Sequence, residues 1–120
     1  MKQDYDFIAD SLLFYINEDY KYKRSIRFNE DIILDFNDKD VPVALELLNA
    51  SKTFNVKKHF LKQPVGIKMD IFVGEDVIKL IAKFPISIHQ KEIPTKPLVE
   101  EKANTINLIA NEAHFDSATA

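Results

Sequence analysis

The segment KRSIRFNEDIILDFNDKDVPVALELL, residues 23–48, decides the fold class. Polar and apolar side chains alternate in residues 23–28 and again in residues 41–48. Turns rich in Asn and Asp, at 29–31 and 37–40, separate the apolar runs. Alternation with a period of two between closely spaced turns is typical of an antiparallel meander. The segment therefore predicts β structure, with strands at 23–28, 32–36 and 41–48.

Further strands are expected on both sides of this segment, at 12–16, 67–73, 77–88 and 106–109. Pro85 breaks the third of these runs, because a proline inside a strand belongs to an edge or a bulge. Residues 92–104 have the composition of a loop, since Pro94 and Pro97 stand among charged residues.

The run 49–62 has a different character. Asn49 is a candidate N-cap for a short helix, with Phe54 and Phe60 as apolar anchors and Pro64 beyond its end. The alternative is a loop across the open end of the sheet. The expected fold class is α+β, predominantly antiparallel β: a small meander sheet with one short helix.

The composition is that of an ordinary globular domain. The 120 residues are 46% hydrophobic and 29% charged, which fits a single domain over 1–120. The absence of cysteine excludes disulfides, thiolate metal sites and cysteine nucleophiles together. Asp4 and Asp6 spoil the pattern of a signal peptide, and no apolar run is as long as a membrane span. We therefore expect a cytoplasmic protein with no membrane partner.

The net charge of -3 argues against a nucleic-acid partner, because such binding draws its affinity from neutralised phosphates. Basic residues nevertheless cluster in two places, at Lys21, Lys23, Arg24 and Arg27 and at Lys57, Lys58, Lys62 and Lys68. We interpret both clusters as solvated faces that keep strands from aggregating, with a local nucleic-acid patch as the alternative.

Two landmarks of the chain are familiar. The first is Tyr5-Asp6, followed by Ala9-Asp10-Ser11-Leu12 and Phe14-Tyr15-Ile16. The second is Ile32-Ile33-Leu34-Asp35, a polar turn, and then Glu46-Leu47-Leu48-Asn49-Ala50-Ser51-Lys52. Together they resemble the family called domain of unknown function 2283, over residues 5–54.

The resemblance implies a small antiparallel sheet with a helix and no established activity. Residues 55–115 are then a β-rich extension, as in longer archaeal members, and residues 116–120 are a tail that is expected to be flexible. Family members are encoded beside small toxin-like proteins in some cases, which suggests an antitoxin or partner-binding role.

An acidic turn invites a calcium interpretation through the oxygen-bearing residues Asp35, Asn37, Asp38, Asp40 and Glu46. An EF-hand loop that begins at Asp35 would have Lys39 at its fifth position, where an oxygen ligand is needed. It would have Asp40 at its sixth position, where the EF-hand has glycine. A hairpin turn is the simpler interpretation, so these five residues are only weak candidates for a metal site.

No other pattern favours catalysis, and no cofactor is expected. His59, His89 and His114 could hold zinc only if folding brought them together, since none has another histidine two or four positions away. The serines lack the Gly-flanked elbow of a nucleophile, and two glycines cannot build a phosphate-binding loop. The catalytic residues are therefore predicted as none, and an enzyme is not favoured.

Polar residues at strand ends are expected to hold the backbone. Asp10, Ser11 and the run 49–52 are predicted to satisfy exposed backbone groups around the first strand. If Glu46 is buried it requires a partner, for which Lys52 or Arg27 is the natural candidate.

Aromatic residues are dense near the N-terminus, and Phe14, Tyr15, Tyr20 and Tyr22 are candidate interaction residues. A single sheet also leaves edges that pair readily. We expect a non-catalytic module that binds a protein partner or self-assembles, with a homodimer as the expected form. The alternatives are an antitoxin-like protein and a small-molecule or metal binder.

A faint internal repeat relates residues 28–33 to 73–78, each with the order strand, acidic turn, strand. Residues 47–54 can likewise be laid over 108–115. The alternative to a duplication is repeated use of one hairpin pattern.

Overall fold

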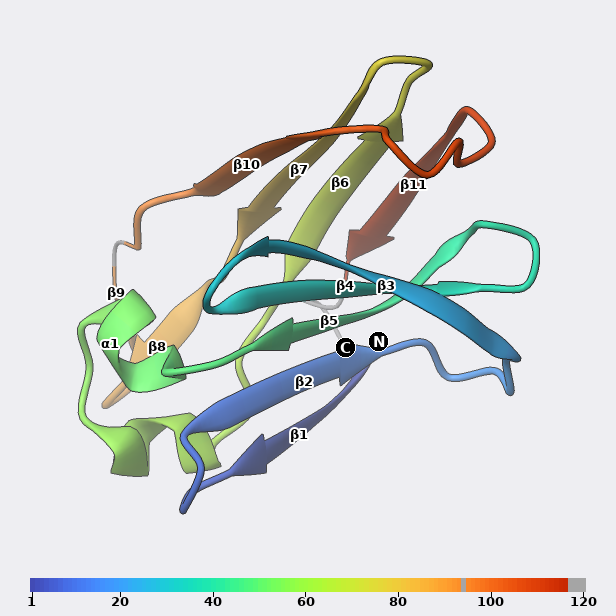
Figure 1. Cartoon of the computed structure of the whole chain (residues 1–120). Helices are drawn as coiled ribbons and strands as arrows, with labels where there is room; N and C mark the ends of the chain where they lie inside the picture. Colours follow the sequence, from blue (N-terminus) through green and yellow to red (C-terminus); the bar gives the residue numbers. More distant parts are fainter. Residues whose placement is uncertain (94, 117–120) are drawn as a thin grey trace.

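The computed structural model describes residues 1–93 and 95–116, which form two antiparallel sheets and a small hairpin (Figure 1). The first sheet has the order β1 (Lys2–Asp6), β2 (Ser11–Tyr15), β5 (Pro42–Leu47), β4 (Ile32–Asn37), β3 (Tyr22–Asn29). The second has the order β10 (Leu98–Ala103), β7 (Val77–Lys83), β6 (Lys68–Val73), β11 (Asn111–Asp116). The hairpin is β8 (Ile86–Ile88) with β9 (Lys91–Ile93). The expected class, α+β and predominantly antiparallel β, is confirmed.

The strands predicted between residues 23 and 48 form a meander, as expected, from β3 through β4 to β5. The rest of the first sheet does not continue this meander. β2 pairs with β5 rather than with β3, in a register that places Leu12 opposite Leu47. The β1–β2 hairpin therefore extends the sheet beyond β5, and the single small meander sheet of the prediction is wrong.

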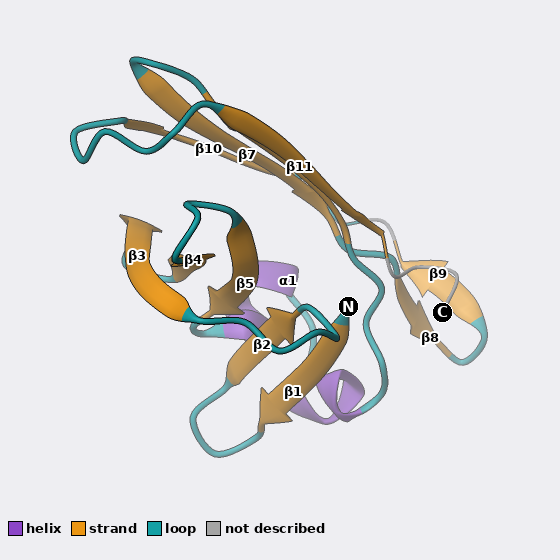
Figure 2. Ribbon diagram, turned by 90° about the vertical axis from the view of Figure 1, so that its right-hand side faces the viewer, coloured by secondary structure: helices purple, strands orange, loops and turns teal. Residues whose placement is uncertain are grey.

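The two sheets face each other and share one core (Figure 2). The inner faces contribute Leu12, Phe14, Ile26, Leu34, Phe36, Leu45 and Leu47 from one sheet and Met69, Ile71, Val73, Ile78, Leu80 and Ala82 from the other. Phe84 follows β7, and its ring lies 5.6 Å from that of Phe14. In β2, β4, β6 and β7 alternate residues are buried, because successive side chains point to opposite faces of a sheet.

Four strands were missing from the prediction: β9 of the small hairpin, and β1, β10 and β11, which are edge strands of the two sheets. β1 alternates charged residues with Gln3 and Tyr5, while β10 and β11 are largely polar. Residues 98–103, predicted as loop, form β10, and Pro94 lies outside the described residues. Residues 106–109, predicted as a strand, precede β11 and have only Leu108 buried. An edge strand needs no continuous apolar run, since it is covered on fewer sides.

The helical segment is shorter than the run 49–62. It consists of α1 (Ala50–Phe54) and a 3-10 turn, η1 (Lys58–Lys62). The predicted N-cap role of Asn49 is wrong: its backbone is left-handed, with φ of 52°, and its side chain makes no capping hydrogen bond. Its amide instead donates to the carboxylate of Asp31.

The internal repeat finds support only at the level of two hairpins. The turns at residues 29–31 and 74–76 each join neighbouring antiparallel strands. The second overlay fails, because residues 50–54 are helical whereas residues 111–115 are a strand. Of the predicted flexible tail, Asp116 lies in β11 and residues 117–120 lie outside the described residues. Among the described residues no helix is long and apolar enough to cross a membrane.

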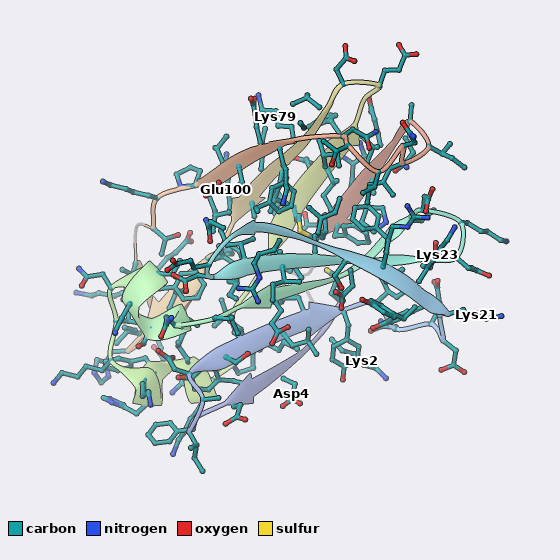
Figure 3. All side chains as sticks on the ribbon, viewed as in Figure 1. Lys2, Asp4, Lys21, Lys23, Lys79 and Glu100 are labelled. Carbon is teal, nitrogen blue, oxygen red and sulfur yellow. The ribbon has the colours of Figure 1, made fainter. Side chains whose placement is uncertain are left out.

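One side of the sandwich is bridged by polar contacts between the edge strands β3 and β10, where Glu100 is labelled in Figure 3. The amide of Asn29 donates to the carboxylate of Glu100 at 3.0 Å, and the Lys102 ammonium donates to the backbone carbonyl of Arg27 at 2.8 Å. These bonds connect the family-like half of the chain to the extension.

Candidate interaction surfaces

A buried carboxylate ties the β1–β2 turn to the start of α1. Asp10 is 7% exposed and accepts hydrogen bonds from the Tyr5 hydroxyl at 2.7 Å and the Ser51 hydroxyl at 2.6 Å. It also accepts the backbone N–H of Ser51 at 3.0 Å, while its own carbonyl accepts from Ala50 at 2.9 Å. Because the first N–H groups of a helix have no partner within it, Asp10 acts as a cap supplied from a distant segment.

The electrostatics of this cluster follow from its burial. Burial alone would raise the pKa of Asp10, but hydrogen bonds from Ser51 and Tyr5, aided by the charge of Lys58, more than offset it and lower that pKa. Burial and the neighbouring carboxylate of Asp10 raise the pKa of the Tyr5 hydroxyl. The carboxylate therefore stays ionised and Tyr5 stays a donor, which suits a structural clamp.

The predicted role in satisfying exposed backbone is confirmed for Asp10, whose carboxylate accepts the N–H of Ser51, whereas the Ser51 hydroxyl donates to that carboxylate. Ser11, next to Asp10, donates through its hydroxyl to Glu46 at 3.3 Å. Glu46 is half-buried on the outer side of the sheet and has this serine as its partner. A pairing of Glu46 with Lys52 or Arg27 was expected only for a buried Glu46; Glu46 is half-buried, and Arg27 donates to the carbonyl of Glu30.

Two weak metal candidates, Asp35 and Glu46, lie on adjacent strands of the first sheet but are held by different serines. Asp35 accepts the Ser25 hydroxyl at 2.6 Å, whereas Glu46 accepts that of Ser11. Neither carboxylate takes part in the turn that the calcium interpretation needed.

The other candidates shape the β4–β5 turn. The Asn37 side chain accepts two backbone N–H groups of that turn, Asp38 is exposed, and Asp40 is buried 3.6 Å from the Arg24 guanidinium. An arginine beside Asp40 disfavours a second cation there. Within the part of the chain that the structure describes, no three acidic or histidine residues are placed to hold a metal ion.

The three histidines are not brought together. His59 and His89 each contact the ring of Phe60, at centroid distances of 4.0 and 6.3 Å. His114 lies on β11, where its Nδ1 is 2.6 Å from the Asp70 carboxylate and its Nε2 is 3.6 Å from Glu112. The zinc interpretation is not supported by this placement.

The four aromatic candidates divide between core and surface. Phe14 is buried in the core, so its predicted role in an interface is wrong. Tyr15 is half-buried and Tyr20 exposed on the outer side of the first sheet, and burial and the Asp35 carboxylate raise the pKa of Tyr20. Tyr22 is exposed, with its hydroxyl 2.6 Å from that of Ser25.

The second sheet presents a surface that the sequence did not indicate, which we call the outer face. It carries the outward-pointing apolar side chains Phe72, Val77, Ile81 and Val99, of which Val99 is 54% exposed. Figure 2 shows no other part of the described chain lying over this face. Exposed apolar side chains gathered on one face mark interaction sites more often than chance exposure does.

The charged side chains around the centre of the outer face are already paired. Lys79 lies 3.8 Å from Glu101, and His114 bonds Asp70 across the β6–β11 pairing. The bond to Asp70 raises the pKa of His114. Lys79 is on the upper sheet in Figure 3. These pairs hold the charged groups in fixed places around the apolar ones.

Sequence reasoning missed the outer face because two of its strands, β10 and β11, were not predicted. The alternation of Asp70, Phe72 and Lys79, Ile81 with buried residues was a usable signal, since it separates two faces of adjacent strands. It could not show which strands flank them.

The fold and these surfaces define a class: a small two-sheet antiparallel β domain that presents an apolar and charged sheet face. Residues 2–51 match the family described as "Protein of unknown function (DUF2283)", and the chain belongs to this family. The resemblance inferred over residues 5–54 is thereby confirmed. The matched part runs from β1 into the start of α1 and contains the Asp10 cluster.

Two archaeal relatives match nearly the whole chain. "Uncharacterized protein MJ0789" of Methanocaldococcus jannaschii is 37% identical over 113 residues, covering 93% of this chain and 95% of that protein. A Methanosarcina mazei protein named "Putative hypoxanthine phosphoribosyltransferase" is 37% identical over 107 residues, covering 89% of this chain and 85% of its own length. No solved structure matches significantly. The β-rich extension is therefore shared with these relatives.

Proposed function

We propose that this protein is a non-catalytic interaction module that self-associates through the outer face of its four-stranded sheet. One observation carries the proposal: apolar side chains occupy one diagonal of that face and opposite charges occupy the other. In the β6–β7 register Ile81 lies opposite Asp70, and Lys79 lies opposite Phe72. The four side chains therefore sit at the corners of a rectangle, with Ile81 and Phe72 on one diagonal.

This rectangle is self-complementary. A two-fold axis along the Ile81–Phe72 diagonal sets each of these side chains against its own copy, as an isologous interface requires. The same axis sets Lys79 of one copy against Asp70 of the other. With strands about 4.8 Å apart and alternate residues about 6.8 Å apart, the strands of the two copies would cross at roughly 70°. Such a crossing belongs to the orthogonal class of sheet packing.

The next shell of charges fits the same axis. The axis places Glu101 of one copy over His114 of the other. The pair Lys79–Glu101 of one copy therefore faces the pair Asp70–His114 of the other, with each charge opposite a charge of the other sign. Two like charges placed directly opposite each other would cost roughly several kcal/mol, and the centre of this interface contains no such pair.

The outer side of the first sheet is a weaker candidate, because its own chain covers part of it. Ala44 points to that side yet is only 1% exposed, and Tyr20 lies close to Tyr15 and Asp35 there. Aromatic density in the sequence pointed to this side, but those side chains largely cover their own sheet.

The expected association is weak. Four strands about 4.8 Å apart and six residues long cover roughly 400 Å² per copy. Stable complexes bury about 800 Å² per partner. We therefore expect a dissociation constant in the micromolar range, which is within reach of sedimentation velocity and native mass spectrometry.

The experiment is a charge exchange across the axis. Lys79→Glu sets a carboxylate against Asp70 of the second copy, and Asp70→Lys sets an ammonium against Lys79. Each change should weaken the dimer about tenfold or more. The double variant Lys79→Glu/Asp70→Lys should regain most of the affinity, because opposite charges meet again.

Lys2→Glu, on β1 of the other sheet, is the matched control and should leave the dimer unchanged. A wild-type protein that stays monomeric at high micromolar concentration would overturn self-association. A dimer that ignores both single changes would overturn the choice of this face.

Other functions give other outcomes in the same measurement on protein from its own cells. A stable complex with a second chain would favour the antitoxin-like role, and a retained small molecule or metal would favour a binder. The name of the Methanosarcina relative adds one assay, incubation with hypoxanthine and a phosphoribosyl donor. Turnover there would replace the proposal by an enzyme.

A further inference from the structure

The turn between β1 and β2 projects two apolar side chains from the molecule. Phe7 is 42% exposed and Ile8 is 93% exposed, the largest value among the exposed large hydrophobic residues of the described chain. Transfer of such side chains out of water is favourable, so an apolar surface that received Ile8 and Phe7 would gain the free energy of their burial.

This turn is held rigidly. The Asp6 carboxylate accepts the backbone N–H groups of Ile8 and Ala9, both at 3.0 Å. Behind it the clamp of Asp10 on Ser51 fixes the turn to α1. The landmark residues of the family therefore converge on a turn that projects the Ile8 side chain almost fully into solvent.

Lysines surround the tip. The ammonium groups of Lys62 and Lys58 lie 4.3 and 5.2 Å from the centre of the Phe7 ring. Lys57 is exposed on the same segment, which passes beside the turn at the lower left of Figure 1. Residues 47–69 contain no Asp or Glu, although the whole chain has a net charge of -3. This segment therefore places positive charge beside the protruding side chains, while the Asp6 carboxylate is engaged by the backbone N–H groups of the turn.

We propose that the Phe7–Ile8 tip and its lysines dock onto an anionic lipid bilayer surface. Ile8 and the edge of Phe7 enter the boundary between headgroups and acyl chains, and Lys57, Lys58 and Lys62 contact the phosphates. The Lys62 and Lys58 ammonium groups rest on the exposed Phe7 ring, so they lie level with the surface that the tip would enter.

The shape of the tip favours a bilayer over a protein or nucleic acid. The tip ends the β1–β2 hairpin, and the hollows between β3 and β10 and beside the β8–β9 hairpin are lined by other residues. An apolar tip ringed by cations suits a soft anionic interface, which deforms to receive it. The sequence argued against a membrane partner because it has neither a signal-peptide pattern nor an apolar run long enough to span a bilayer, and surface docking needs neither.

The test is co-sedimentation of the full chain with vesicles of phosphatidylcholine alone and of phosphatidylcholine mixed with phosphatidylglycerol. We expect binding only to the anionic vesicles, weakening as salt is added. Ile8→Ser should lower the partition coefficient about tenfold, because the lost side chain no longer leaves water. Lys58→Glu/Lys62→Glu should lower it by about tenfold or more.

Matched controls separate docking from general surface changes. Ile109→Ser removes an exposed isoleucine far along the chain, and Lys21→Glu/Lys39→Glu reverses two lysines outside the tip. Both should retain binding, and circular dichroism should show every variant folded. Binding that is absent, that ignores Ile8→Ser, or that occurs with a labelled oligonucleotide or polyglutamate but not with vesicles would overturn the proposal.

Discussion

At the scale of single residues, Asp10 organises more of the structure than its neighbours do. It adopts a left-handed backbone with φ of 55°, which Asp tolerates better than bulkier residues. That conformation turns the chain from β1 into β2 and directs the carboxylate toward Ser51, 41 positions away. A buried charge is stable only when paired or fully hydrogen-bonded, and Asp10 meets the second condition.

Replacing Asp10 should therefore destabilise the folded chain. Asp10→Ala leaves the Tyr5 hydroxyl and both Ser51 donors without their acceptor, and we expect a loss of about 2–4 kcal/mol in the free energy of unfolding. Urea denaturation measures it. Asp38→Ala, at an exposed turn position, should change the free energy by less than about 0.5 kcal/mol. Equal stability of the two variants would contradict the role given to the clamp.

The same carboxylate makes stability depend on pH. The pKa of Asp10 is lower in the folded chain than in the unfolded one, so its contribution is present above about pH 4 and is lost as the pH falls through the folded value. Asp10→Asn, which cannot ionise, should be less stable than wild type at pH 7, and the gap should narrow below pH 4. Urea titrations at several pH values give the gap; a gap that stays constant would argue against an ionised Asp10.

At the scale of elements, α1 is short because left-handed residues limit it at both ends. Asn49 precedes it with φ of 52°, and Asn55 follows it with φ of 54°. The N–H groups at this C-terminal end bond back to the carbonyls of Ser51 and Lys52, which satisfies acceptors that a helix end leaves free.

Asn55 offers a direct test of that geometry. Asn55→Ala places a Cβ in a left-handed conformation and should cost about 1 kcal/mol, whereas Asn55→Gly should cost nothing or stabilise slightly. Thermal or urea unfolding of the two variants measures the difference. If alanine proves as stable as glycine, the left-handed cap is not maintained in solution.

The elements also show why the sequence predicted some strands and missed others. The alternation of β3 and the apolar runs of β4, β6 and β7 reflect inner faces, which burial imposes on the sequence. β1, β10 and β11 are edge strands in which charged residues replace the apolar alternation, so only their pairing partners define them. β3 is the fourth edge strand, and its alternation made it predictable. Local pattern therefore found the central strands of both sheets but only one of the four edge strands.

The same limit applied to the candidate sites. Asp10 and Ser51 were recognisable as strand-end polar residues, because such groups commonly satisfy backbone there. Their direct bond joins segments whose proximity depends on β2 pairing with β5, a choice that no local pattern encodes. The outer face likewise needed the flanking pairings of β10 and β11.

At the scale of the whole molecule, the two sheets are joined by the shared core and by polar bonds along one side. The Arg24 guanidinium donates to the carbonyl of Ile106, and the Asn111 amide donates to that of Asp40. These contacts leave the outer face of the second sheet free of the first sheet. A dimer formed through that face would therefore not disturb the core.

Such a dimer should strengthen as the pH falls, through His114. Its own chain presents Asp70 and Glu112 to the imidazole, and the Asp70 bond raises its pKa above the ordinary 6.5. In the proposed dimer the Glu101 carboxylate of the second copy also faces the imidazole. Because all three groups are carboxylates, the dimer holds the proton more tightly than the monomer does, so proton binding and dimerisation favour each other.

Sedimentation velocity at pH 6 and at pH 8.5 should therefore give a lower dissociation constant at pH 6. His114→Gln keeps the size and polarity of the side chain without a titrating group, and its dimer should lose that pH dependence. Glu101→Gln should reduce the dependence in the same way, since it removes the carboxylate that dimerisation would bring to the imidazole. A pH dependence that survives both changes would place His114 outside the interface and the two-fold axis on another surface.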